Sequence, residues 1–364
     1  MKFLKFPKGF KPIFVDWAIT TKCHLNCTHC RYRGGKKNTT ETRRHRELNK
    51  KQALVLAKEI SKLEPQWILI EGGEPFLRKD IFNIIRILKP RMNTNKHEFN
   101  KAKNLSNPCN PWLDSPPVYI ITSGIGFNES LAKKCKETGV KLMISLDSAI
   151  ENTYKKIRIG AKLSDAVNAI KIAQKFVILD SINFTLQELN ASAKEIKAIG
   201  KLAHKLQIKS INFLGLKPNA ACATNTRLVA NFDKLFREIT NIGDKYKINV
   251  KVDEPFYKPW LVNSKFQIPN SKFSKQGPIV ADEKSGCIFG EYLFIEPDGT
   301  TKPCSFSPLS FQEIGFDVIK KIQNKRNRKG KCGQCRYQSE CGGCRVRTYT
   351  LTGDWLASDP YCPL

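Results

Sequence analysis

The sequence predicts an α/β fold in which parallel strands alternate with crossover helices. Six short apolar runs of strand length follow one another between residues 13 and 214. Amphipathic stretches with helical spacing separate these runs, and such alternation is typical of parallel strands joined by helices. Six strand–helix units are too few for a closed eight-stranded barrel.

Each expected element can be placed along the chain. We expect strands at 13–19, 67–71, 118–122, 140–146, 176–184 and 208–214. We expect helices at 48–63, 79–89, 128–138, 164–175 and 191–206, and a further helical pattern covers 231–247. Residues 90–117 are rich in Asn, Pro and Lys and show no periodicity, so we interpret them as an insertion loop.

The composition places the protein in a reducing compartment without a membrane span. The 364-residue chain has 13 cysteines, many of them in tight clusters, which suits metal ligation better than a disulfide framework. The N-terminus lacks an apolar core of signal-peptide length, and no stretch is long and apolar enough to span a membrane. We therefore expect a cytoplasmic protein with no membrane partner.

The formal net charge of +29 is extreme. It would suit a polyanionic partner, such as nucleic acid, an acidic peptide or a carboxylate-rich small molecule. Alternatively, it reflects a lysine-rich coding bias with the lysines on solvated helix faces. The densest basic runs, 31–51, 86–103 and 320–331, lack the regular aromatic residues of a single-strand stacking platform. Nucleic acid is therefore not the expected partner.

The most informative motif is a set of three cysteines. Cys23, Cys27 and Cys30 form C-x3-C-x2-C directly after the first apolar run. Three thiolates on a short loop can hold three irons of a cubane cluster and leave the fourth iron open for a ligand. One strand–helix unit later comes Glu71-Gly72-Gly73-Glu74-Pro75. Its glycines allow close backbone approach to a ligand, although an ordinary strand-to-helix turn is also built this way.

Together the two motifs resemble those of radical S-adenosylmethionine enzymes. The resemblance implies an open (β/α)6 partial TIM barrel, in which a reduced four-iron cluster held by the three cysteines cleaves S-adenosylmethionine. The resulting 5′-deoxyadenosyl radical would abstract hydrogen from a substrate at the barrel mouth. A low-potential electron donor of the ferredoxin or flavodoxin type would be a partner. No catalytic acid or base can be assigned.

The resemblance also implies contacts to the cofactor. His29 stands where the family places an aromatic ring beside the adenine, and Ser123 takes part in a turn at the barrel mouth. Ser145 and Asp147 end the fourth strand, where relatives hold the ribose hydroxyls. Arg158 would pair with the cofactor's carboxylate, to which a guanidinium can bind in bidentate fashion. The Gly72, Gly73, Glu74 and Pro75 motif would receive the ammonium group.

A second set of cysteines closes the chain. Cys287 and Cys304 flank an expected hairpin that turns at 297–299. After them come Cys332, Cys335, Cys341 and Cys344, spaced as C-x2-C-x5-C-x2-C, and then Cys362. This order resembles the SPASM extension of radical S-adenosylmethionine enzymes, although the third gap is two residues where the commonest form has three.

The extension implies two auxiliary iron–sulfur clusters. By position, one would be held by Cys332, Cys335, Cys341 and Cys362, and the other by Cys287, Cys304 and Cys344. The second set is one cysteine short, so its fourth iron would be open to substrate or capped by Asp282 or Glu283, with Cys222 as a weaker candidate. Cys109 and Cys135 are interpreted as thiols without a ligand role.

Zinc offers an alternative interpretation. The four cysteines between 332 and 344 could form one tetrahedral structural site. A non-enzymatic zinc-binding protein that contacts nucleic acid is accordingly the hypothesis from a different functional class. It leaves Cys287, Cys304 and Cys362 unexplained.

The resemblance divides the chain into a core at 1–230 with the 90–117 insertion, a bridging region at 231–280 and the SPASM domain at 281–364. The C-terminal pattern resembles a branch with haem-maturing and peptide-modifying members. We therefore expect an oxidoreductase that remodels propionate groups of a carboxylate-rich tetrapyrrole, which the basic surplus would suit. The alternative is a maturase of a ribosomally synthesised peptide. Against it, the first strand begins by residue 13 and leaves no room for a leader-binding domain.

Overall fold

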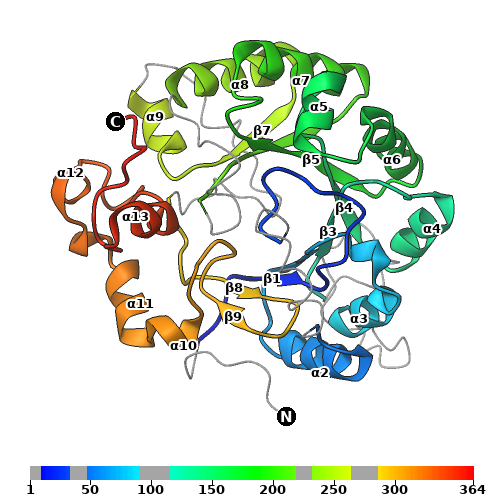
Figure 1. The fold of residues 1–364 in the computed structure, drawn as a ribbon, viewed down its shortest axis with the longest axis horizontal. Helices are drawn as coiled ribbons and strands as arrows, with labels where there is room; N and C mark the ends of the chain where they lie inside the picture. Colours follow the sequence, from blue (N-terminus) through cyan, green and yellow to red (C-terminus); the bar gives the residue numbers. More distant parts are fainter. Residues whose placement is uncertain (1–9, 33–46, 90–114, 219–231, 264–285) are drawn as a thin grey trace, which may run out of the picture.

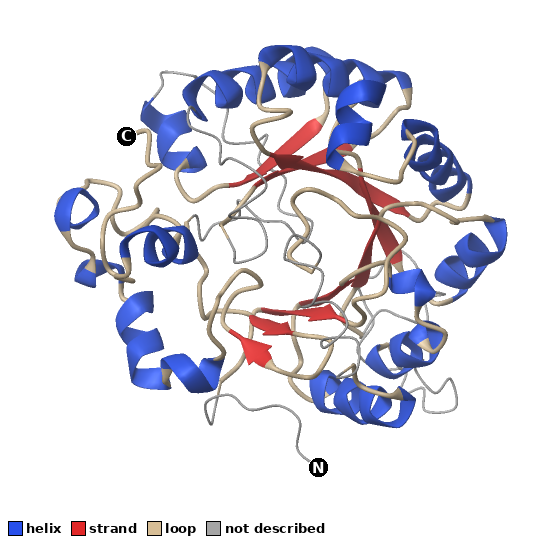
Figure 2. Cartoon of the chain, viewed as in Figure 1, coloured by secondary structure: helices blue, strands red, loops and turns tan. Residues whose placement is uncertain are grey.

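The computed structural model describes residues 10–32, 47–89, 115–218, 232–263 and 286–364. Within them, one nine-stranded sheet forms the centre of the fold. Helices cover the outer side of this curved sheet (Figures 1 and 2). The strand order is β7-β6-β5-β4-β3-β2-β1-β8-β9. Because the order ends at β7 on one side and at β9 on the other, the described sheet is open, as the resemblance implied.

The strands have the following bounds: β1 Phe14–Ala18, β2 Trp67–Glu71, β3 Val118–Thr122, β4 Lys141–Ser145, β5 Leu179–Leu186, β6 Ser210–Gly215, β7 Asn249–Asp253, β8 Leu293–Ile295 and β9 Thr301–Lys302. Neighbours from β7 to β8 are parallel, and β9 runs antiparallel to β8. The six expected strands and the expected hairpin are thus confirmed.

Helices follow the strands on the outer side. They are α2 Lys50–Ser61, α3 Ile81–Leu88, α4 Glu129–Glu137, α5 Glu151–Ile157, α6 Leu163–Lys175, α7 Ala193–Lys205, α8 Phe232–Tyr246, α9 Tyr257–Asn263, α10 Phe311–Ile314, α11 Phe316–Gln323, α12 Gly330–Gly333 and α13 Arg345–Thr352. Local sequence sets some of their starts. At α2, Asn49 and Gln52 bond each other's backbone in a capping box.

Three features differ from the sequence-based expectation. The fifth strand begins at Leu179 rather than at 176, because Phe176 caps α6 and Val177 turns the chain with φ 58°. Within the predicted bridging region, β7 extends the core sheet next to β6. The hairpin strand β8 pairs in parallel with β1, so the cysteine-rich C-terminal part adds directly to the edge of the core sheet.

The two faces of strand β1 pack against different parts of the protein. In β1, Val15 and Trp17 belong to the main core under the helices. Their neighbours Phe14 and Ala18 point the other way, because side chains alternate along a strand, and they pack in a smaller apolar cluster with Tyr292 of the C-terminal part. The inner side of the sheet is therefore where the core and the C-terminal part meet.

Some predictions concern residues that the structure does not describe. Most of the insertion at 90–117 lies outside the described residues, as do Cys109, Cys222, Asp282 and Glu283. Cys135 is fully buried in α4, as expected of a packed thiol. In the described part of the chain, no helix is long and apolar enough to cross a membrane.

Candidate active site

The three N-terminal cysteines lie on the loop that follows β1. The carboxyl ends of parallel strands share one edge of the sheet, which is where α/β folds place their sites. Cys27 is buried, and Cys23 and Cys30 are partly buried. The amide of Leu25 donates to the Cys23 sulfur at 3.4 Å, as expected of a loop whose backbone faces a sulfur ligand.

The glycines after β2 bring this loop against the sheet. The amide of Gly73 donates to the carbonyl of Thr20, and that of Glu74 donates to the carbonyl of Lys22, both at 2.7 Å. A Cβ on Gly72 would lie 2.4 Å from the Thr20 oxygen, and one on Gly73 would lie 2.1 Å from the Lys22 oxygen. Both positions therefore exclude a side chain. The close approach that the sequence predicted for a ligand is here made to the chain's own cysteine loop.

Glu74 and Ser123, both expected to contact the cofactor, contact each other. The Glu74 carboxylate accepts hydrogen bonds from the Thr122 hydroxyl at 2.8 Å, the Ser123 hydroxyl at 2.7 Å and the Ser123 amide at 3.0 Å. It is only 1% exposed, and burial raises its pKa against the effect of these hydrogen bonds. Glu74 thus joins the mouth ends of β2 and β3. Pro75 begins a buried 3-10 turn, Pro75–Leu77.

On the other side of the mouth, three further predicted residues lie together. Asp147 accepts a hydrogen bond from Arg158 Nε at 2.6 Å and one from the Thr185 amide at 2.7 Å. His29 Nε2 lies 3.8 Å from the same carboxylate, and Arg158 Nη1 lies 4.0 Å from the Cys27 sulfur. Burial opposes ionisation of Asp147, yet Arg158 and His29 hold its pKa below the usual value.

His29 is held as a neutral ring. Burial lowers its pKa to about 4, although Asp147 acts in the opposite direction. Gln187 Nε2 lies 3.3 Å from His29 Nδ1, and its Oε1 accepts a hydrogen bond from Thr28 at 3.2 Å. Ser145, the remaining predicted contact, is buried at the end of β4 opposite Asn183.

Sequence reasoning missed the segment after β5. Gln187 and Asn190 are fully buried there, and Asn190 Nδ2 donates to the carbonyls of Asp147 and Thr185 at 2.8 and 2.9 Å. These contacts fix the strand ends on which Asp147 and Thr185 lie. The available signal was the presence of Gln187 and Asn190 shortly after a predicted strand, at the end where parallel strands place their sites.

The loop fits an iron–sulfur cluster. Every cysteine in the described ranges is a free thiol, and burial raises the pKa of Cys27 to about 11. A thiolate at that depth needs a cation, which cluster iron would supply, and Arg158 adds a guanidinium beside the sulfur. In the described part of the chain, no three His, Cys, Asp or Glu side chains converge on a single-ion site.

Several C-terminal cysteines are buried and influence one another's pKa. Burial raises the pKa of Cys304 to about 11, and Cys287 adds to this shift. Burial likewise raises the pKa of Cys341 to about 12, with contributions from Cys362 and Cys332. Burial also raises the pKa of Cys344, and the charge of Cys287 adds to this shift. Cys335 is partly buried. The assignment of these cysteines to two ligand sets stays a prediction.

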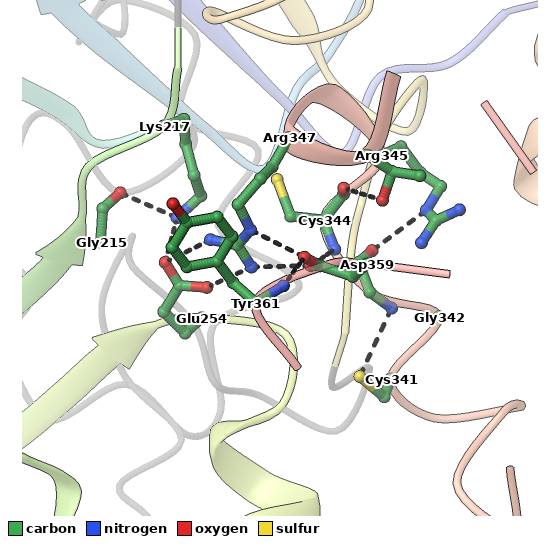
Figure 3. A network of polar contacts seen from close by, with 12 residues as sticks. Gly215, Lys217, Glu254, Cys341, Gly342, Cys344, Arg345, Arg347, Asp359 and Tyr361 are labelled. Carbon is green, nitrogen blue, oxygen red and sulfur yellow. Dashed lines mark hydrogen bonds and ion pairs between the residues drawn. The ribbon is translucent and has the colours of Figure 1, made fainter. Parts of the chain in front are cut away.

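A buried network of charges joins the C-terminal part to the mouth of the barrel (Figure 3). Arg347 on α13 donates to Glu254, after β7, at 3.0 and 3.2 Å, and to Asp359 at 2.7 and 2.9 Å. Lys217, after β6, donates to Glu254 at 2.9 Å. Asp359 also accepts a hydrogen bond from the Cys344 amide at 2.8 Å. The position of one cysteine backbone thus depends on this network.

We expect Gly73→Ala to lower the amount of iron retained by the chain. The added Cβ would meet a backbone carbonyl, which cannot move aside like a flexible side chain, so the cysteine loop must shift. Overpacking of this kind costs about 1–3 kcal/mol. Gly126→Ala is the control, because its Cβ meets no atom within 4 Å and only its left-handed backbone is strained. Iron per chain after anaerobic reconstitution and desalting is the measurement; equal retention by both variants would contradict the expectation.

We expect Arg347→Met to destabilise the protein strongly. It leaves Glu254 and Asp359 buried without this cation, and breaking a buried pair in that way costs about 3–5 kcal/mol. Lys329→Met is the control, because it removes the exposed Lys329–Asp354 pair, 2.7 Å apart, which should contribute less than about 1 kcal/mol. Adding Asp359→Asn to Arg347→Met should recover part of the loss. The measurement is urea unfolding of the four chains, and equal effects of the two single variants would count against the network.

The comparisons with known proteins agree with this geometry. Residues 17–186 match the Radical SAM superfamily. The chain is 25% identical to an AdoMet-dependent heme synthase of Methanosarcina barkeri over 96% of both chains. It is 29% identical to a probable GTP 3′,8-cyclase of Methanocaldococcus jannaschii over 82% of this chain and 86% of the relative.

The fold is shared with a solved structure as well. SuiB of Streptococcus suis, solved bound to S-adenosylmethionine, superimposes with a TM-score of 0.66 at 14% identity, over 97% of this chain and 77% of SuiB. At that identity the likeness concerns the fold alone, and it extends beyond the matched domain into the cysteine-rich C-terminal part. The protein is an enzyme that carries a radical SAM domain at residues 17–186.

Proposed function

We propose that this enzyme uses S-adenosylmethionine and a four-iron cluster to oxidise a haem-related tetrapyrrole. The observation that carries the proposal is the similarity to an AdoMet-dependent heme synthase over 96% of both chains. At that coverage the alignment extends into the cysteine-rich C-terminal part, whereas the family match ends at residue 186. The probable GTP cyclase covers less of this chain. SuiB, also solved with its precursor peptide, supports the peptide hypothesis by fold alone.

In this proposal the radical cluster would be held by Cys23, Cys27 and Cys30. When bound, the reduced cluster and S-adenosylmethionine supply a 5′-deoxyadenosyl radical, which removes a hydrogen atom from the substrate. Arg158 directs its Nη1 toward the Cys27 sulfur and would orient that ligand. Asp147 keeps Arg158 in place and leaves the guanidinium's remaining donors for an anionic group. His29, neutral and held by Gln187, would offer its ring face to a base.

The inner side of the sheet would receive the substrate. Asn212 and Asn183 lie at lumen-facing positions, and Asn212 Nδ2 donates to Asn183 Oδ1 and Ser181 Oγ at 2.8 Å. Asn212 Oδ1 and Asp16 Oδ1 are buried and have no hydrogen-bond partner among the residues that the structure describes. Unpaired buried acceptors cost free energy, which a donor on a bound substrate would offset. A large polar ligand fits this lining better than a purely apolar one.

The positive net charge of the chain does not identify an anionic substrate. Arg31, which follows Cys30, lies against Glu71 in an ion pair. The carboxylates of Asp16 and Glu296 also act on Arg31 through their charges. Three carboxylates, those of Glu71, Asp16 and Glu296, therefore surround the Arg31 guanidinium group. The haem-related substrate is supported by the relative, and the anionic character of that substrate stays a prediction.

The C-terminal thiols would hold auxiliary clusters that accept the electron left on the oxidised substrate. We assign Cys332, Cys335, Cys341 and Cys362 to one cluster and Cys287, Cys304 and Cys344 to the other. These assignments, like the division into a core at 1–230, a bridge at 231–280 and an extension at 281–364, are supported by the resemblance. The backbones of the two cysteine sets meet at one point, where the Cys287 amide donates to the Cys341 carbonyl at 3.1 Å.

We expect formation of 5′-deoxyadenosine to rise above its uncoupled level when propionate-bearing iron porphyrins are added. The reconstituted enzyme, S-adenosylmethionine and dithionite would be mixed without oxygen, and the porphyrin mass and the nucleoside would be followed together. GTP and a synthetic peptide serve as competing substrates, and a Cys23→Ala, Cys27→Ala, Cys30→Ala chain as the blank. Stimulation by GTP or the peptide alone would refute the tetrapyrrole assignment.

A further inference from the structure

Two buried arginines hold the turn that begins at Cys341. Gly342 and Gly343 form the centre of this turn, and both have a left-handed backbone, with φ 68° and 61°. Arg328 Nε donates to the Gly342 carbonyl at 3.1 Å, and Arg345 Nε donates to the Gly343 carbonyl at 3.2 Å. The Gly343 amide donates to the Cys341 sulfur at 3.4 Å. The turn therefore offers its carbonyls to the arginines and an amide to a thiol.

Neither arginine forms an ion pair with a carboxylate among the residues that the structure describes. Arg345 is fully buried and Arg328 is 6% exposed. Arg345 Nη1 donates to the carbonyls of Trp355 and Ala357 at 2.8 and 2.9 Å, so its partners are backbone groups. Arg345 Nη2 and Arg328 Nη1 have no hydrogen-bond partner in the described ranges. Arg347, on the same helix α13, instead meets two carboxylates (Figure 3).

The charges around the two guanidinium groups favour a bound anion. Burial and the charge of Arg345 lower the pKa of Arg328 to about 10. Three cysteines act in the opposite direction: Cys287, Cys332 and Cys341. Arg345 and the Asp354 carboxylate also act on each other through their charges, but Asp354 is bonded to Lys329, 2.7 Å away. Because a buried charge without a partner is costly, an anion beside these cysteines would stabilise both arginines.

Cys332 is attached to the same surroundings. Its amide donates to Ser358 Oγ at 2.9 Å, and this hydroxyl donates to the Lys329 carbonyl at 3.1 Å. Lys329 directly follows Arg328, and Ser358 directly follows a residue whose carbonyl accepts a hydrogen bond from Arg345. Two cysteines of one assigned ligand set, those at 332 and 341, are thus held next to both arginines.

We propose that Arg328 and Arg345 compensate the charge of the auxiliary cluster assigned to four cysteines and raise its reduction potential. These cysteines are Cys332, Cys335, Cys341 and Cys362. The proposal rests on the proposed function, because it needs a cluster on this set. A four-iron cluster with thiolate ligands is an anion, and its potential depends on nearby charge and on hydrogen bonds to its sulfurs. The unpaired Nη groups supply both a positive charge and hydrogen-bond donors.

The redox step is the transfer of one electron. In the proposed function, the substrate loses this electron and the auxiliary cluster gains it, which adds one negative charge to the cluster. No bond forms or breaks at the arginines, and both keep their protons. Two buried cations stabilise the reduced cluster more than the oxidised one, because the reduced cluster is more negative. They therefore favour passage of the electron from the substrate to this cluster.

The test measures the reduction potential of this cluster in a full-length chain whose three N-terminal cluster cysteines are replaced by alanine. The auxiliary clusters are reconstituted without oxygen, and each sample is titrated with dithionite and mediators while its electron paramagnetic resonance spectrum is followed. The signal that Cys335→Ala removes belongs to the cluster in question. Arg328→Met and Arg345→Met remove the two charges, and lysine at either position keeps the charge. Arg336→Met is the matched control, because this exposed arginine directly follows Cys335.

Each buried methionine variant should make the cluster at least about tenfold harder to reduce at a fixed solution potential, a shift of about 59 mV for one electron. Arg328→Lys and Arg345→Lys should retain most of the potential, because the ammonium group keeps the charge although it loses the planar fork of donors. Arg336→Met should shift the potential less, because solvent and salt screen an exposed charge.

Iron and sulfide per chain separate the possible outcomes. Equal potentials in the buried and the exposed methionine variants, at full iron content, would overturn the proposal. Loss of auxiliary iron from the lysine and methionine variants alike would show that the arginines only hold the turn, and would overturn it as well. Loss from the methionine variants alone would support charge compensation. If the parent chain binds no auxiliary iron, the auxiliary clusters of the proposed function fail, and this proposal fails with them.

Discussion

Two backbone hydrogen bonds, from Gly73 and Glu74 to the carbonyls of Thr20 and Lys22, place the cysteine loop on the edge of the sheet. They can form because Gly72 and Gly73 carry no side chain that would meet the carbonyls of Thr20 and Lys22. Further contacts connect this loop to strand ends on both sides of the barrel mouth. On one side, Glu74 accepts hydrogen bonds from Thr122 and Ser123 at the end of β3. On the other side, Arg158 lies between Cys27 of the loop and Asp147 after β4. The loop is thereby held between two sets of strand ends.

Buried charged side chains with hydrogen-bond partners also fix the position of the C-terminal part. Arg347 satisfies two carboxylates from different regions of the chain, one after β7 and one three residues before Cys362. Such a cluster contributes little net stability compared with apolar packing, yet it is costly to break. It therefore specifies one position for the C-terminal cysteines relative to the barrel. Together with the pairing of β8 on β1, it makes the extension a continuation of the core rather than a tethered module.

Local patterns in the sequence sufficed for the fold class, the six core strands and the cysteine loop, because strand alternation and ligand spacing are properties of neighbouring residues. Contacts between residues that are far apart in the chain could not be predicted from the sequence. Asp147 and Arg158 were each expected to meet the cofactor, and nothing in either motif indicates that they bind each other. Gln187, Asn190 and Arg347 contact residues 159, 43 and 93 positions away in the sequence, and a local sequence pattern does not reveal such pairings. Strand β7 is short and half polar, so its place in the sheet is set by β6.

The most direct test of the account is the metal content of the chain. Iron, sulfide and zinc should be counted per chain after purification and reconstitution without oxygen, with a visible spectrum of the same sample. One radical cluster and two auxiliary clusters predict on the order of twelve irons with matching sulfide, absorbance near about 400 nm and negligible zinc. About four irons with zinc would replace the auxiliary clusters by a structural site. Zinc alone in a colourless protein would contradict the radical enzyme.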